Sequence, residues 1–108
     1  MNEHLKRGLQ QAESEIAAGR PRLYWNTRGG WGELFTELMS NRFGVVVEHV
    51  GDMTTANKRA FEEGNNSTVK SFIGSKFGED AFQRILDEIE AYRQSTYQQY
   101  HASKQDNE

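Results

Sequence analysis

The spacing of hydrophobic and polar positions changes along this chain, and each change marks the boundary of an element. From Trp31 to Phe43 the apolar side chains recur at steps of three and four residues, which predicts an amphipathic helix that ends at Gly44. Segments 22–26 and 45–50 are rich in branched and aromatic residues and predict two short strands. Valines on both sides of the second segment predict that both faces of the sheet are covered where it begins. A strand, a turn, a helix and a second strand form the pattern of a parallel crossover connection.

Helical periods also predict an element near each end of the chain. Residues 2–18 carry a thin apolar stripe that stops before Gly19, which is typical of a helix at the edge of a domain or against a partner. Residues 79–100 predict a long C-terminal helix with an acidic first turn, as the helix dipole favours. Its apolar stripe weakens after Tyr92, so we expect the helix end to fray and a polar flexible tail to begin at about residue 102.

The stretch between the second strand and the last helix allows two interpretations. A threonine cap at position 54 or 55 predicts a short helix, which we expect to end at 64–66 because the Gly-Asn-Asn found there favours turns. Segment 67–77 then fits a further helix, because its apolar spacing extends past the length of a strand. A third strand at 67–73 is the alternative.

These elements predict the α+β class. We expect one helix-rich domain over residues 1–108, with a small sheet of two strands (about 22–26 and 45–50), a crossover helix between them and a long C-terminal helix. The length of 108 residues is common for a single domain. If 67–73 is a strand, the fold becomes a three-stranded α/β layer structure instead.

The composition narrows the functional classes. The sequence contains no cysteine, which excludes disulfides, thiol nucleophiles and cysteine-ligated metal sites. The first residues carry charge and no apolar run, so we expect a cytoplasmic protein with neither a signal peptide nor a membrane span. The formal net charge is −3, without a concentrated basic stretch, so general nucleic-acid binding is not expected.

The most specialised segment runs from Tyr24 to Gly32 and holds both tryptophans, three of the ten glycines and an arginine. Glycines between a strand and a helix can present backbone N–H groups to an anion, and Arg28 can add a bidentate contact. The spacing matches neither phosphate-binding glycine motif, so a turn that needs glycine is the simpler interpretation. His49 and Asp52 follow the second predicted strand at its carboxyl end, where parallel sheets place their ligands. The candidate ligand or partner surface therefore consists of Tyr24, Thr27, Arg28, Gly29, Gly30, Trp31, His49 and Asp52.

Catalytic chemistry has no comparable signal. None of the serines lies in a nucleophile elbow or an S-x-x-K arrangement, and no third ligand or base accompanies His49 and Asp52. We therefore name no catalytic residue, expect no metal and no cofactor, and favour a protein without enzymatic activity.

The sequence thus favours a small protein-interaction or regulatory module. Tyrosine, tryptophan and arginine, the residue types enriched at binding hot spots, all occur within 24–31. Tyr92, Tyr97 and Tyr100 add an aromatic surface on the last helix, which predicts a protein partner or a homodimer. An anion- or nucleotide-binding protein that uses the turn at 27–32 is the alternative. A weak single-stranded nucleic-acid binder, with basic residues beside the aromatic ones, is the third hypothesis.

Overall fold

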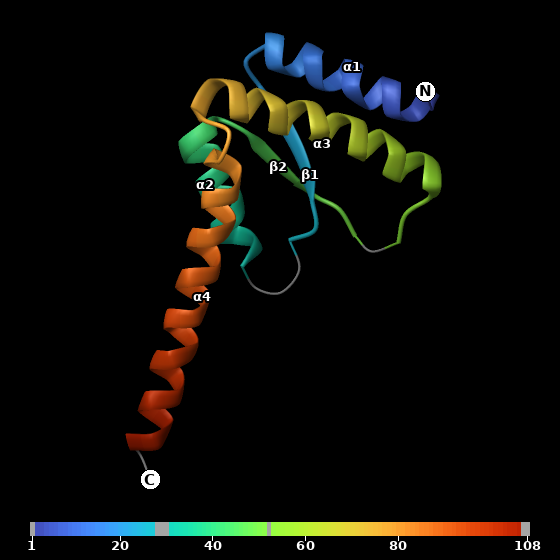
Figure 1. Cartoon of the computed structure of the whole chain (residues 1–108). Helices are drawn as coiled ribbons and strands as arrows, with labels where there is room; N and C mark the ends of the chain where they lie inside the picture. Colours follow the sequence, from blue (N-terminus) through green and yellow to red (C-terminus); the bar gives the residue numbers. More distant parts are fainter. Residues whose placement is uncertain (1, 28–30, 52, 107–108) are drawn as a thin grey trace.

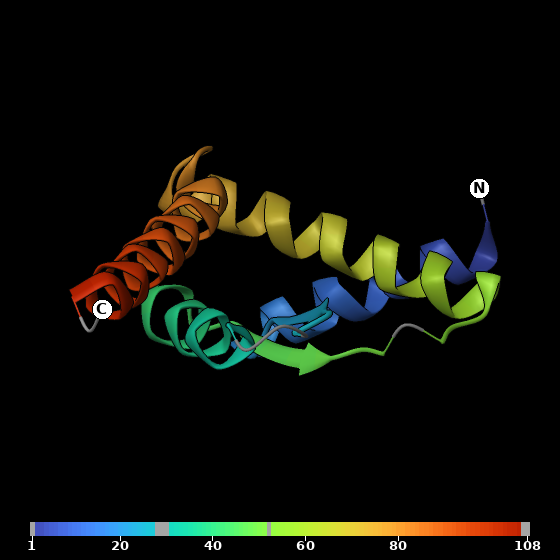
Figure 2. The ribbon, with the colours of Figure 1, turned by 90° about the horizontal axis from the view of Figure 1, so that it is seen from below.

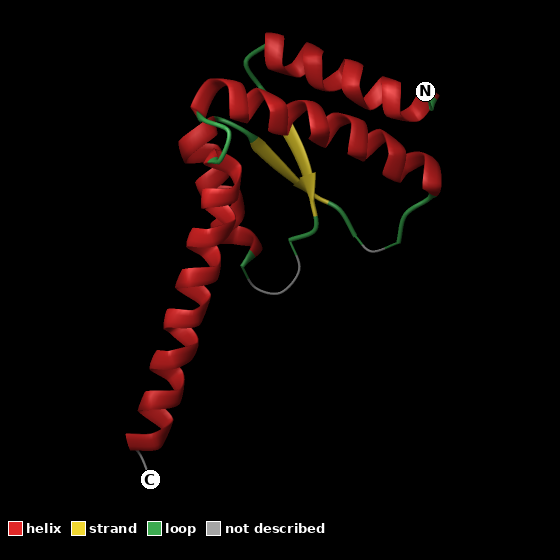
Figure 3. Ribbon diagram, viewed as in Figure 1, coloured by secondary structure: helices red, strands yellow, loops and turns green. Residues whose placement is uncertain are grey.

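The computed structural model of the protein describes residues 2–27, 31–51 and 53–106, with side chains described up to residue 97. Within these ranges the chain forms four helices and two strands (Figures 1 and 3). The elements are α1 (Glu3–Ala17), β1 (Arg22–Trp25), α2 (Gly32–Phe43), β2 (Val46–His49), α3 (Ala56–Phe77) and α4 (Ala81–Asp106). The predicted α+β class, with two strands, a crossover helix and a long C-terminal helix, is confirmed.

The two strands form a parallel sheet, and α2 makes the connection between them. The register begins with Arg22 opposite Val46. Val45, just before β2, is completely buried on the inner face, whereas Val46 points the other way and is 54% exposed. On the outer face the Gln11 side chain of α1 contacts Tyr24 of β1, whereas Val46 of β2 stays exposed. The prediction that both faces are covered at the start of β2 is therefore wrong.

Asn2 caps the start of α1, because its side chain accepts hydrogen bonds from the backbone N–H groups of His4 and Leu5. The helix lies alongside α3 (Figure 1), and the two backbones are in close contact at two glycines. A Cβ added to Gly8 would overlap the carbonyl oxygen of Phe61, and a Cβ added to Gly64 would overlap that of Leu5. The close contact of α1 with α3 therefore requires glycine at both positions.

α3 is one continuous helix, whereas the sequence predicted a stop at 64–66. Its predicted threonine cap is present, because the Thr55 hydroxyl accepts a hydrogen bond of 3.1 Å from the backbone N–H of Lys58. The predicted stop is wrong because Gly64 and the two asparagines after it make tertiary contacts instead of a turn. Segment 67–73 is helical, so the three-stranded alternative is not formed.

Asn65 and Asn66 close the edge of β1 that β2 does not pair with. The side-chain nitrogen of Asn65 donates to the carbonyl oxygen of Arg22 at 2.7 Å. The side-chain oxygen of Asn66 accepts from the Tyr24 N–H at 2.9 Å, and its nitrogen donates to the Tyr24 carbonyl oxygen at 2.7 Å. The side-chain amide of Asn66 thus takes the place of a peptide group from a further strand.

The core lies between the inner face of the sheet and α2, α3 and α4. The Trp25 ring stacks on Phe35 with centroids 5.2 Å apart and meets the edge of Phe82 at 5.6 Å. The buried apolar residues are Ala12, Leu23, Phe35, Met39, Phe43, Val45, Val69, Ile73, Ala81 and Ile85. The apolar face predicted for the crossover helix therefore does pack into the core.

α4 gives the molecule an elongated shape. The principal extents are 59 × 32 × 19 Å and the radius of gyration is 16.8 Å, whereas a compact chain of this length has a radius of about 13 Å. Figures 1 and 2 show α2 and α4 together on one side of the molecule, with α4 continuing well past the other elements. The helix runs to Asp106, beyond the end predicted near Tyr100, and the flexibility of the tail from about 102 stays a prediction.

Candidate functional site

Two of the predicted site residues meet at the carboxyl ends of the strands. The backbone N–H of Thr27 donates to Nδ1 of His49 at 3.2 Å, and the Thr27 hydroxyl lies 2.5 Å from the same nitrogen. Nδ1 of His49 therefore acts as an acceptor that holds the segment after β1 against the end of β2. The exposed imidazole ring is positioned by this contact.

Two aromatic members of the predicted surface are packed against other elements. Tyr24 is half-buried, its hydroxyl accepts a hydrogen bond of 2.8 Å from Gln11, and its ring meets the edge of Phe61. Trp31 occupies the residue before α2, and its ring contacts Tyr92 of α4 at a centroid distance of 5.6 Å. Both rings thus connect elements of the fold, and both stay partly accessible.

Four of the predicted site residues lie outside the described residues. These are Arg28, Gly29, Gly30 and Asp52. The anion hypothesis for the turn at 27–32 therefore stays a prediction.

A groove of about 660 Å³ lies beside that turn and runs along α2. Thr27 and Gly32 line one end of it, and Glu33 and Glu37 contribute two carboxylates. Its described lining contains no cationic side chain. An anion in this groove would face like charges, so the groove lends no support to the anion hypothesis.

A second groove, of about 750 Å³, opens at the carboxyl ends of the strands, where parallel sheets place their ligands. Arg59 and Lys70 line it together with Glu62 and Glu63, so its formal charges cancel. The Lys70 ammonium also lies over the Trp25 ring, 5.2 Å from its centroid. The lining therefore favours no ligand of a single charge sign.

The basic residue beside the β1 aromatics is neutralised by its neighbours. Arg22 donates to the Glu48 carboxylate at 2.8 Å and lies 3.4 Å from a carboxylate oxygen of Glu15. The hydrogen bond to Glu48 raises the pKa of Arg22 above its ordinary value. Two carboxylates against one guanidinium reduce the basic surface on which the nucleic-acid hypothesis depends.

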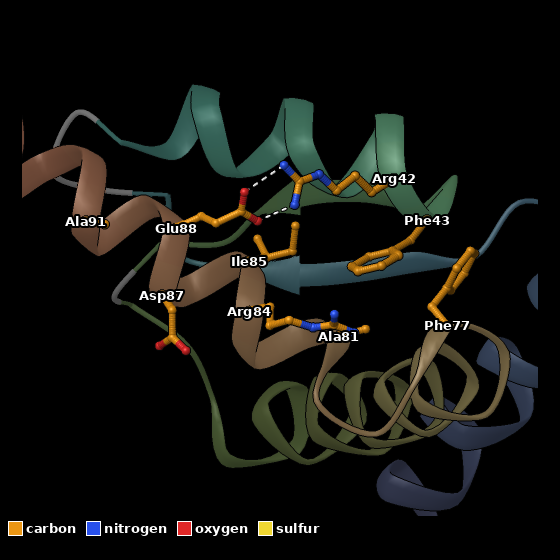
Figure 4. Close-up of a pocket in the computed structure, with 9 residues that line it drawn as sticks. All are labelled: Arg42, Phe43, Phe77, Ala81, Arg84, Ile85, Asp87, Glu88 and Ala91. Carbon is orange, nitrogen blue, oxygen red and sulfur yellow. Dashed lines mark hydrogen bonds and ion pairs between the residues drawn. The ribbon is translucent and has the colours of Figure 1, made fainter.

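An apolar groove opens where the ends of α2 and α3 meet the first half of α4 (Figure 4). It has a volume of about 680 Å³, and Phe43, Phe77 and Ile85 form its apolar wall. At its rim the Arg42 guanidinium makes two hydrogen bonds to the Glu88 carboxylate, one of them 2.8 Å long. These bonds lower the pKa of Glu88 and raise that of Arg42. The pair connects α2 to α4 across the mouth of the groove.

Sequence reasoning did not identify this apolar groove. Phe43 and Ile85 carry the signal of core positions, which they also are. Arg42 and Glu88 are 46 residues apart, so no local pattern indicates that they form a pair. Only the packing of three helices creates this surface.

Beyond the apolar groove, α4 leaves the body of the molecule. Tyr92 contacts Trp31, and residues 93–97 are exposed. The helix then continues through residues 93–106, a length of about 21 Å at 1.5 Å per residue (Figure 1). Tyr92 is 58% exposed and Tyr97 is 64% exposed. An aromatic surface on the last helix, as the sequence suggested, is therefore accessible at these two positions.

Within residues 2–27, 31–51 and 53–106, no group of three or more histidines, aspartates or glutamates is arranged to hold a metal ion. No helix in the described part of the chain is long and apolar enough to cross a membrane. No protein-family model matches the chain, and comparison with curated proteins and with solved structures finds none that is similar to it.

Proposed function

We propose that this protein is a protein-interaction module that contacts its partner through the outer half of α4, residues 92–106. The observation that carries the proposal is the continuation of α4 far past the other elements (Figure 1). A single domain of this size normally folds its helices back onto its own core. A helix that extends away from the core instead is available for a surface outside the chain.

The energetics of the outer half of α4 support the proposal. Its described side chains are exposed. Arg93 and Gln94 contact Glu90, one turn earlier in the same helix, at 4.0 Å and through a 3.2 Å hydrogen bond. Local pairs of this kind contribute about 0.2–0.5 kcal/mol each, and isolated helices of about 12–15 residues are marginal in water. A partner would supply the apolar packing that stabilises most helices in folded proteins.

The residue types on the outer half also suit recognition. Tyr92, Arg93 and Tyr97 belong to the types that contribute most binding energy at protein interfaces. The Trp31 ring, in contact with Tyr92, extends this aromatic surface onto the body. A partner that covers the outer half of α4 would therefore contact the Trp31 ring as well as α4.

We also propose that the module works in the cytoplasm. A chain of 108 residues without cysteine lacks the disulfide framework that small secreted domains commonly use. Its stability depends on the core alone, which is the usual situation of proteins in a reducing compartment.

Photo-crosslinking from α4 tests the proposed function. A photoreactive amino acid replaces Tyr97 in the full-length chain, and adducts formed in the producing cell are identified by mass spectrometry. Ser95 is the matched control, because it lies at nearly the same distance along α4 but about 160° around the helix. The proposal expects adducts to one defined protein from position 97 and a much lower yield from position 95. No adduct from position 97, or equal labelling from both positions, would overturn it.

A further inference from the structure

The outer half of α4 carries a regular stripe of residues on one face. Glu90, Arg93 and Tyr97 follow one another at steps of three and four residues, and the helical backbone brings positions 100 and 104 onto the same face. These last two positions are a tyrosine and a lysine in the sequence. Alternating steps of three and four residues are the period of helices that pair along a seam. Positions 90, 93, 97, 100 and 104 together form the α4 stripe.

The described members of the α4 stripe are accessible. The side chains of Glu90 and Arg93 are 53% and 59% exposed, and Tyr97 is 64% exposed. Glu90 lies where α4 leaves the body, so the α4 stripe begins at the edge of the body and runs outward.

We propose that the α4 stripe pairs with the same stripe of a second copy of this chain, in antiparallel orientation and with the two-fold axis beside Tyr97. This inference rests on the proposed function and names its partner. Two-fold dimers are the most common assemblies of identical chains, and their contact uses the same patch on both copies.

The order of charges along the α4 stripe selects a second antiparallel copy. With the axis at position 97, Glu90 lies opposite the partner's position 104, because both are seven residues from the axis. A carboxylate thus meets a position that carries a lysine, once on each side of the axis. A parallel pair would instead place Glu90 against the partner subunit's Glu90, and one lysine against the other, which is unfavourable.

The attachment of the body fits the same orientation. Each body joins α4 at its first half, so an antiparallel pair places the two bodies at opposite ends of the paired helices. In a parallel pair both bodies would lie at the same end and compete for the same space. The antiparallel pair therefore avoids a steric conflict as well as a repulsion between like charges.

The size of the contact sets the expected affinity. Positions 90 to 104 span about 21 Å of helix, less than three heptads. The contact is thus smaller than the roughly 800 Å² per copy of a standard specific interface, and we expect a dissociation constant on the order of 10 µM.

Sedimentation equilibrium of the full-length chain, between about 1 and 200 µM, tests the second copy as the partner. The expected result is a monomer of 12.4 kDa at the lower end and a mass approaching twice that value at the upper end. Tyr97→Glu places two carboxylates at the axis and is expected to weaken the dimer by on the order of 100-fold. Ser95→Glu adds the same charge on the opposite face and is expected to leave the dimer unchanged.

A charge exchange tests the antiparallel register. Glu90→Lys and Lys104→Glu each place like charges opposite one another and are expected to weaken the dimer roughly tenfold. The double variant restores opposite charges and is expected to return the affinity to within about threefold of the original. Circular dichroism of each variant, at a concentration where all are monomers, controls for changes in the helicity of α4.

The outcomes separate this inference from the proposed function. A chain that stays monomeric at every concentration, or a dimer that Tyr97→Glu leaves intact, overturns the second copy as the partner. A dimer that the double charge exchange does not restore overturns the antiparallel register. If crosslinking from position 97 then captures a different protein, the proposed function stands and the dimer does not. If it captures no protein, both fail.

Discussion

Asn66 shows how one side chain can complete a secondary-structure element from which it is distant in the sequence. Its amide bonds both backbone groups of Tyr24, which is 42 positions earlier in the chain. Sequence patterns associate asparagine with turns, because its side chain competes with local backbone hydrogen bonds. In α3 the same side chain hydrogen-bonds the backbone of β1 instead. Its role therefore depends on Tyr24, a neighbour in space that no local sequence pattern indicates.

Replacing Asn66 with alanine is expected to destabilise the fold. Tyr24 loses a donor and an acceptor at a half-buried position, and each unsatisfied backbone group costs about 1–3 kcal/mol. The better helix propensity of alanine offsets about 0.5 kcal/mol. We expect urea denaturation to show a loss of about 2 kcal/mol in the free energy of unfolding. Ser67→Ala, at the exposed neighbouring position, is the control, and an equal effect of both substitutions would contradict this role of Asn66.

The pair of Arg42 and Glu88 predicts a dependence of stability on pH. The hydrogen bonds from Arg42 hold the pKa of Glu88 below its usual range. A carboxyl with a lowered pKa in the folded state contributes stability above its unfolded pKa, which is about 4.3, and loses that contribution as the pH falls through its folded pKa. The stability difference between the native chain and Glu88→Gln is therefore expected to be largest above about pH 5 and to vanish in acid.

Urea denaturation at a series of pH values measures this difference. Glu37→Gln, which removes one exposed carboxylate from α2, corrects for the change in net charge. High salt is expected to reduce the difference, because both side chains of the pair are partly exposed. A difference that stays constant from neutral to acid pH would show that the pair does not stabilise the fold through its charge.

At the scale of elements, the sequence predicted what local periodicity determines. The apolar steps of α2, the valines around β2 and the cap at Thr55 all act within a few residues, and their elements are present in the structure. The predicted helix end at 64–66 is wrong because the residues there are determined by a contact that is distant in sequence. Glycine is required at position 64 because α1 lies against it. α1 and α3 are distant in the sequence, since both strands and α2 lie between them.

Two glycines of α3 provide a matched pair that tests this explanation. Glycine inside a helix usually costs about 0.5–1 kcal/mol relative to alanine. At Gly74 an added Cβ would lie 3.8 Å from the nearest atom, in ordinary contact, so Gly74→Ala is expected to stabilise the fold by that amount. At Gly64 the added Cβ would overlap the backbone of α1, so Gly64→Ala is expected to cost more than about 2 kcal/mol.

The free energies of unfolding of the two variants, measured under the same conditions, test this explanation. Opposite signs support glycine at 64 as a packing requirement. If Gly64→Ala stabilises the chain as Gly74→Ala does, α1 and α3 do not approach as closely as the structure shows.

At the scale of the whole molecule, the proposed interaction surface differs from the segment that the composition indicated. The tryptophans and glycines of residues 24–32 are conspicuous in the sequence, yet the described members of that segment contact other elements of the fold. The outer half of α4 is inconspicuous in composition, because its polar residues resemble a fraying helix end. We propose it as the interaction surface because of where α4 leaves the body, and that position depends on packing among elements distant in sequence.

Shortening α4 tests whether its outer half belongs to the interaction surface or to the body. A chain that ends at Ser95 loses no buried side chain described in the structure, so it should unfold cooperatively, with a free energy of unfolding within about 0.5 kcal/mol of the Tyr97→Glu variant. Tyr97→Glu is the proper reference, because dimer formation itself stabilises the native chain by mass action.

A chain that ends at Arg84 loses Ile85, which is 1% exposed, and the half-buried Leu86 and Ile89. Losing one such side chain from a core costs about 2–5 kcal/mol, so this shorter chain is expected to lack a cooperative urea transition. If the chain ending at Ser95 also loses its transition, the outer half of α4 is required for folding, and the argument that it exists to meet a partner fails.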